Sequence, residues 1–282
     1  MIEMFAMSWV PLVLISAGAG FIGALLGLGG GFIIVPVLTL LYGFDMRSAV
    51  GAALVAVIAT SSGSSVTYLK RAYSNLELAA FLEISTVIGA VIAVLVAGQI
   101  PPKVLYICFA LLMLVSATMM AKNNFNHHKD AALLPDPEAP KGFSIEGSFH
   151  EPSGAVVKYH TRHTWIGFGL SGFAGLMSGL LGVGGGIVKV PTMNLIMGVP
   201  LKAASATSNL MVGMTAASTA ILMFSRGEIP IETAAYIAVG VYFGARAGSR
   251  KLHGTSNRNI SLIFAIVAAI LAYQMFMKGL RL

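Results

Sequence analysis

The stretch Gly27-Leu28-Gly29-Gly30-Gly31, followed by Val35-Pro36, returns 155 residues later as Gly182-Val183-Gly184-Gly185-Gly186, followed by Val190-Pro191. The same shift, made without a gap, also matches Thr60 with Thr215, Arg71 with Arg226 and Glu77 with Glu232. An excess of Gly, Ala and Leu does not explain matches at Pro, Arg, Glu and Thr in one register. The chain is therefore an internal duplication.

The composition limits the class of protein in which this duplication occurs. Hydrophobic residues make up 56% of the 282 residues and charged residues 10%, whereas a soluble domain carries about 25% charged residues. A large soluble enzyme and a disordered chain are both excluded. We expect a polytopic membrane protein, and we ascribe the net charge of +7 to basic loops at the cytoplasmic lipid surface, not to nucleic-acid binding.

Each half contains five apolar runs, and most of them reach the length of about 20 residues that a membrane span needs. The runs cover 8–27, 31–43, 46–69, 77–99 and 103–121, and then 164–181, 185–198, 202–225, 230–250 and 259–277. We expect an all-α fold with transmembrane repeats at 1–121 and 164–282 and a polar loop at 122–163. The short second run of each half follows the glycines, which predicts a broken or re-entrant helix there.

The distribution of Lys and Arg predicts the topology. With an odd number of crossings per half the repeats are inverted, and one side receives twelve of these residues against five on the other. Fusing the first two runs makes the halves parallel and weakens the bias to ten against seven. We therefore expect inverted repeats, with both termini outside and the 122–163 loop in the cytoplasm.

The paired glycine clusters are the first candidate site. A helix that begins inside the membrane directs N–H groups and a positive dipole end at the break, and two such breaks facing each other favour an anion. The alternative is that the glycines only permit close helix packing. The candidate residues are Gly29, Gly30, Gly31, Gly184, Gly185 and Gly186.

Lys189 and Glu83 are charged residues inside apolar runs, where charge is costly. We expect Lys189 to bind an anionic substrate; the alternative is a lysine that extends to the membrane interface. Replacing Lys189 with Met should leave the thermal stability without substrate level or raise it, because an unpaired buried cation is lost. For Glu83, protonation, pairing with a basic residue and proton coupling are all left open.

Hydroxyl and amide side chains occupy the middle of the third run of each half. They are suited to binding anionic oxygens or, together with backbone carbonyls, a coupling cation, although small polar residues also pack helices together. Thr60 and Thr215 match across the repeat and are expected behind the glycines. Thr207, Ser208 and Asn209 complete the expected substrate-binding set.

Other chemistry receives little support from the sequence. The glycine motif precedes no soluble βαβ pattern, and the chain has no Gly-Lys-Ser/Thr phosphate loop, which argues against nucleotide binding. The histidines of the 122–163 loop match no common ligand spacing. We expect no cofactor, no metal site and no enzymatic activity. The segments 142–150 and 155–162 flank a Pro-Ser-Gly turn and suggest a small hairpin.

The duplicated Gly-x-Gly-Gly-Gly motif with its following Val-Pro, at 27–36 and 182–191, resembles the TauE/SafE sulfite exporter family. The resemblance implies a secondary transporter of a small, sulfur-containing anion that works by alternating access in a prokaryotic inner membrane. An anion channel is the alternative function. The partners implied are the anion and membrane lipid, with a coupling proton or sodium ion and a homo-oligomer left open.

The inverted assignment predicts which ends of the chain face the cytoplasm. A reporter that is active only in the cytoplasm should be active when it is fused within 122–163 and inactive when it is fused after Leu282. Activity of both fusions, or the reverse pattern, would contradict the assignment.

Overall fold

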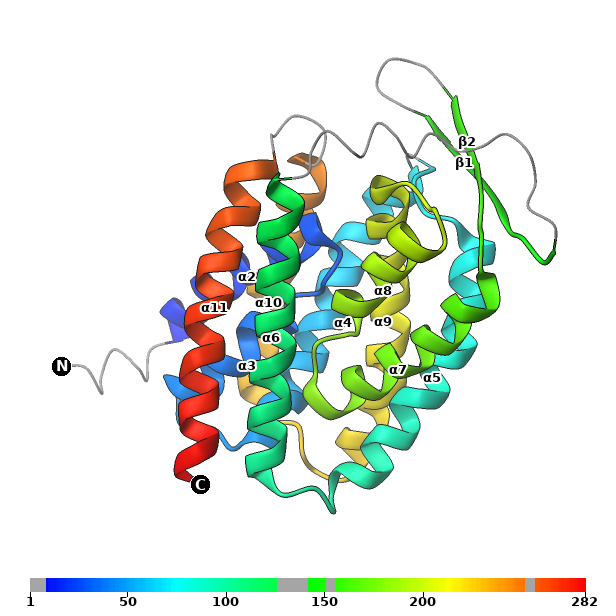
Figure 1. Ribbon diagram of the computed structural model, residues 1–282. Helices are drawn as coiled ribbons and strands as arrows, with labels where there is room; N and C mark the ends of the chain where they lie inside the picture. Colours follow the sequence, from blue (N-terminus) through cyan, green and yellow to red (C-terminus); the bar gives the residue numbers. More distant parts are fainter. Residues whose placement is uncertain (1–8, 71, 126–141, 151–155, 252–256) are drawn as a thin grey trace.

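The computed structural model of the chain describes residues 9–70, 72–125, 142–150, 156–251 and 257–282. Within these residues, ten helical segments pack into one bundle (Figure 1). The first half forms α2 (Trp9–Leu26), α3 (Gly31–Leu40), α4 (Met46–Lys70), α5 (Leu76–Ala97) and α6 (Pro102–Phe125). The second forms α7 (Thr164–Leu181), α8 (Gly186–Pro191) with the π-helical turn η2 (Thr192–Ile196), α9 (Leu201–Ser225), α10 (Ile231–Lys251) and α11 (Asn257–Arg281). Each helix of the second half begins 155 residues after its counterpart, as the duplication predicts.

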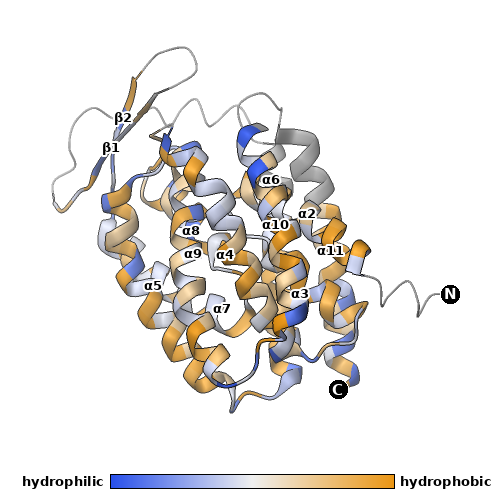
Figure 2. Cartoon of the chain, turned by 180° about the vertical axis from the view of Figure 1, so that it is seen from behind, coloured by the Kyte–Doolittle hydropathy of each residue, from blue (hydrophilic) through white to orange (hydrophobic). Residues whose placement is uncertain are grey.

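The expected all-α membrane protein is confirmed. Within the described residues, six helices are long and apolar enough to cross a membrane: α2, α4, α5, α6, α7 and α9. Large apolar side chains such as Ile88, Leu114 and Phe243 are exposed on the outside of the bundle, where water would disfavour them and lipid would not. Figure 2 shows the hydrophilic residues gathered mainly at the two ends of the bundle.

Glycines in a left-handed backbone conformation separate the first two helices of each half. Gly27 and Gly29 have φ of +73° and +72°, and their counterparts Gly182 and Gly184 have +70° and +72°. Side chains other than hydrogen disfavour this left-handed region. The helix resumes at the last glycine of each motif, at Gly31 and at Gly186, and not at the prolines that follow.

The two glycine motifs lie against each other. A Cβ built on Gly31 would fall on the carbonyl oxygen of Gly182, and one built on Gly186 would fall on the carbonyl oxygen of Gly27. These two contacts exchange under the shift of 155 residues, so the halves are related by an approximate two-fold axis that passes between the motifs.

The packing of the long helices follows the same two-fold relation between the halves. Helix α2 packs on α10, where Gly244 approaches the carbonyl of Ala17, and α7 packs on α5, where Gly89 approaches the carbonyl of Gly172. Helices α4 and α9 pack on each other in the middle of the bundle. Helices α6 and α11 also pack together, and in Figure 1 α6 rises towards the hairpin end while α11 descends to the C-terminus.

The hairpin expected in the polar loop is confirmed. Strands β1 (Glu146–His150) and β2 (Val156–His160) are antiparallel, with Glu146 opposite His160. Phe149 and Tyr159 are buried against the bundle, and the Asn75 amide donates to the carbonyl of Glu146 at 2.9 Å. The hairpin therefore covers the N-terminal ends of α5 and α9.

The contact between the motifs predicts the effect of one added methyl group. Gly31→Ala should lower the free energy of unfolding by about 1–3 kcal/mol, because the methyl group overlaps the backbone of Gly182, which cannot move independently of its helix. Thermal unfolding in detergent measures this loss. The matched control is Gly18→Ala in α2, where nothing lies within 4 Å and Ala should stabilise the helix. Equal melting temperatures for the two variants would contradict the tight contact.

Candidate functional site

Lys189 lies within the bundle, three residues after the glycine at which α8 begins. Its side chain is 0% exposed, so it does not extend to an interface as a snorkelling lysine would. The short helix α8 packs against α7 and α9. A wholly buried ammonium group requires partners for its charge and for its N–H donors.

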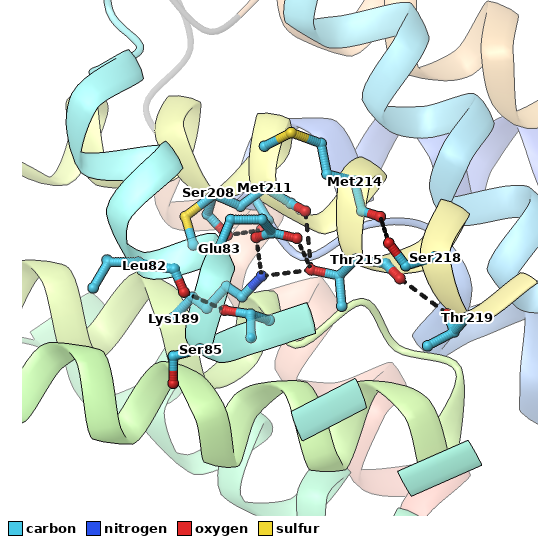
Figure 3. A network of polar contacts seen from close by, with 12 residues as sticks. Leu82, Glu83, Ser85, Lys189, Ser208, Met211, Met214, Thr215, Ser218 and Thr219 are labelled. Carbon is cyan, nitrogen blue, oxygen red and sulfur yellow. Dashed lines mark hydrogen bonds and ion pairs between the residues drawn. The ribbon is translucent and has the colours of Figure 1, made fainter. Parts of the chain in front are cut away.

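The partners are Glu83 of α5 and Thr215 of α9 (Figure 3). Lys189 Nζ lies 3.3 Å from Glu83 Oε2 and donates to Thr215 Oγ1 at 3.0 Å. Thr215 Oγ1 lies 2.6 Å from Glu83 Oε1. The three side chains thus form a closed triangle that joins three helices.

This pairing resolves one of the alternatives left open for Glu83 and corrects one expectation for Lys189. The Glu83 side chain is 9% exposed and is paired with a basic residue. Lys189 therefore has a partner in its own chain. The expectation that Lys189→Met would leave the thermal stability level or raise it assumed an unpaired lysine, and that assumption is wrong. Removing either charge leaves the other buried without a counter-charge.

The triangle breaks the two-fold relation between the halves. In the first half Thr60, the counterpart of Thr215, accepts a hydrogen bond from the Gly30 N–H at 3.1 Å. The residues that correspond to Lys189 and Glu83 by the shift are Ile34 and Ala238. Gly30 has φ of −72°, whereas its counterpart Gly185 has +73°. The charged site therefore exists on one side of the axis.

The structure brings the predicted glycines together at the axis. Gly29 and Gly184 both lie against the side chain of Val57, and Gly31 and Gly186 each approach a carbonyl of the opposite motif. The space between the motifs does not admit a methyl group, so it does not admit an anion in this conformation. Of the glycine N–H groups expected to face a ligand, that of Gly30 is already bound by Thr60.

The other polar candidates bind backbone groups. Thr207 Oγ1 accepts from the N–H of Asn75 at 3.0 Å, at the start of α5. Ser208 donates to the carbonyl of Gly27 and Asn209 to that of Ala24, both at 3.0 Å. Ser208 and Asn209 thus satisfy carbonyls at the broken end of α2, which have no partners in a continuing helix.

A groove on the outside of the bundle does not coincide with the triangle. Ser85, Ile88 and Ile92 of α5 and Phe168 and Phe173 of α7 are among its lining residues. The lining is almost entirely apolar, and Ile88, Ile92 and Phe173 are exposed on the outer surface. The groove suits a lipid chain better than an anion.

Comparison with known proteins identifies a family that matches nearly the whole chain. Residues 12–275 match the family described as sulfite exporter TauE/SafE. The chain is 27% identical to the probable membrane transporter protein YunE of Bacillus subtilis, over 97% of this chain and 99% of that one. It is 24% identical to the probable membrane transporter protein MJ0441 of Methanocaldococcus jannaschii, over 94% of each chain. No solved structure matches the chain.

The buried pair predicts a pattern of stabilities. Lys189→Met should lower the free energy of unfolding by about 3–5 kcal/mol, because it leaves the Glu83 carboxylate without its counter-charge. The double variant Glu83→Gln with Lys189→Met should recover most of this loss. Thermal unfolding in detergent compares them, with the exposed Lys70→Met at the end of α4 as the control. Additive losses in the double variant would show that the two side chains are not coupled.

Proposed function

The chain belongs to the TauE/SafE sulfite exporter family, and from this premise we propose that it is a secondary transporter of a small, sulfur-containing anion. Sulfite and organosulfonates are the substrates that we propose first, with export as the direction. The family and the relatives are named for transport, and membrane transport is the function that they share.

The observation that carries the proposal is the buried ammonium of Lys189. A lysine inside a membrane-spanning bundle is expensive and is functional by default. It lies beside a broken helix, which is where secondary transporters bind their substrates. A compact ammonium with a neighbouring hydroxyl suits the oxygen atoms of a small anion. We therefore place the anion at Lys189 and Thr215, and we assign Thr207, Ser208 and Asn209 to the support of helix ends.

Alternating access is the mechanism that we propose. The exchange of contacts about the two-fold axis, and the opposite directions of α6 and α11 in Figure 1, support inverted repeats. In such a fold, one group of helices rocks against another around a fixed site. The site proposed here lies between helices of both halves, and glycine backbone contacts form part of the interface between the halves.

We propose that the protein lies in a prokaryotic inner membrane, with both termini outside and the 122–163 loop in the cytoplasm. The exposed apolar side chains of the long helices then contact lipid. The hairpin β1–β2 lies at the cytoplasmic end of the bundle in this orientation, together with Arg162 before α7.

Counterflow into proteoliposomes tests this function. Labelled sulfite, thiosulfate, sulfoacetate and taurine should be compared, and at least one of the three anions should accumulate against an internal pool of itself. A charge-assisted hydrogen bond contributes about 1.5–3 kcal/mol, so Lys189→Met should raise the apparent Kd about tenfold to a hundredfold. Lys70→Met should leave it unchanged.

Two other results would contradict the proposal. Single-channel currents far above carrier turnover would identify an anion channel instead. Counterflow in the Lys189→Met variant with wild-type affinity would remove Lys189 from the binding site.

A further inference from the structure

The hydrogens in the triangle of Lys189, Glu83 and Thr215 can be arranged in two ways, one with Glu83 ionised and one with Glu83 protonated. Thr215 has one hydroxyl hydrogen and two acceptors within reach, Glu83 Oε1 at 2.6 Å and the carbonyl of Met211 at 3.0 Å. When Glu83 is ionised, the hydroxyl donates to the carboxylate. When Glu83 is protonated, its own O–H donates to Thr215 Oγ1 and the hydroxyl turns to the carbonyl of Met211.

In both states each contact within the triangle has a donor and an acceptor, and the Thr215 hydroxyl bonds to the Met211 carbonyl only when Glu83 is protonated. In each of them Lys189 still donates to Thr215 Oγ1, which has a second lone pair for a hydrogen from Glu83. The network therefore accommodates a proton on Glu83 without losing a hydrogen bond. In an ordinary buried ion pair, without the shared hydroxyl, the O–H of the protonated carboxyl group would have no acceptor.

The surroundings provide no alternative counter-charge for Lys189. Helix α5 contains one other acidic residue, Glu77, which is exposed in its first turn. Helix α7 and η2 contain no titratable side chain, and the only one in α9 is Lys202 in the first turn. Lys189 is the single titratable residue of α8. In the part of the chain that the structure describes, Glu83 is therefore the one anion that faces the ammonium.

A second anion at this ammonium would leave the site with an uncompensated negative charge. Two anions that share one cation in a low-dielectric site cannot both remain ionised at low cost. An incoming anion therefore favours protonation of Glu83. A sodium ion would not serve as well, because it would have to bind the carboxylate whose Oε2 lies 3.3 Å from the Lys189 ammonium, and the two cations repel each other.

We propose that Glu83 is an exchangeable internal counter-ion of Lys189 and the proton-binding site of the transporter. In the exchange, the ionised Glu83 paired with Lys189 takes up one anion and one proton. It becomes a neutral carboxylic acid beside a Lys189–anion pair, with one O–H bond formed and no other bond changed. For a monovalent anion the step is electroneutral, so the anion and proton gradients together set the direction of transport. This inference rests on the proposed function, because it assigns the anion to Lys189.

Proton uptake on anion binding tests the proposal. The purified protein is titrated by calorimetry with thiosulfate and with sulfoacetate, neither of which changes its own charge near neutral pH. Buffers of different ionisation heat report the protons taken up. The wild type should take up one proton per anion, and its Kd should rise about tenfold for each unit of pH above neutrality. Glu83→Gln should take up no proton and should bind with the low-pH affinity of the wild type at every pH.

Glu77→Gln is the matched control, since it removes a carboxylate from the exposed first turn of the same helix; it should behave as the wild type. Should Glu83→Gln not yield folded protein, infrared spectroscopy of the wild type decides the question. Addition of thiosulfate or sulfoacetate should produce the C=O band of a protonated carboxylic acid at the expense of a carboxylate band.

The outcomes separate this inference from the proposed function. Anion binding without proton uptake in the wild type, or with undiminished uptake in Glu83→Gln, would overturn the role of Glu83 and leave anion transport intact. If sulfite, thiosulfate and sulfoacetate all show neither binding nor counterflow, the proposed function fails and the inference fails with it.

Discussion

Direct backbone contact between the two glycine motifs is the constraint on which the rest of the structure depends. Gly31 approaches the carbonyl of Gly182 and Gly186 approaches that of Gly27, and neither approach tolerates a Cβ. Glycine weakens a helix, and a broken helix in a membrane exposes polar backbone. Both penalties are offset because each break is covered by the other and by residues of α4 and α9. The contact fixes the two-fold axis, and the pairing of α2 with α10 and of α7 with α5 follows from it.

The departures from this two-fold relation are concentrated at one place. On one side of the axis Thr60 binds a backbone N–H, which is a structural role that needs no charge. On the other side the same threonine position binds Lys189 and Glu83, and Gly185 adopts the left-handed conformation that its counterpart does not. A duplicated fold needs only one charged site to bind one anion, and a second buried pair would add cost without adding a function.

Much of the fold could be predicted from the sequence, because the shift of 155 residues places every helix of one half onto its counterpart. The breaks, the hairpin and the choice of Lys189 followed from residues that violate the local pattern. The pairing of Lys189 with Glu83 did not follow, since 106 residues separate them and periodicity carries no information on contacts between halves. The roles of Ser208 and Asn209 were missed for a different reason. A polar side chain in an apolar helix looks the same in sequence whether it faces a ligand or the open end of a neighbouring helix.

The position of the ion pair between the halves links binding to motion. Glu83 belongs to the first repeat, and Lys189 and Thr215 belong to the second, so their contacts hold α5 of one half to α8 and α9 of the other. A movement that separates these helices must break the pair, and an unpaired buried charge opposes that movement. In the exchange that we propose, the anion that replaces Glu83 travels with Lys189 and removes the electrostatic link, because Glu83 is neutralised at the same time. A ligand shifts a conformational equilibrium only through its different affinity for the two states. The exchange of counter-ions supplies that difference at the site itself, without a separate relay through the bundle.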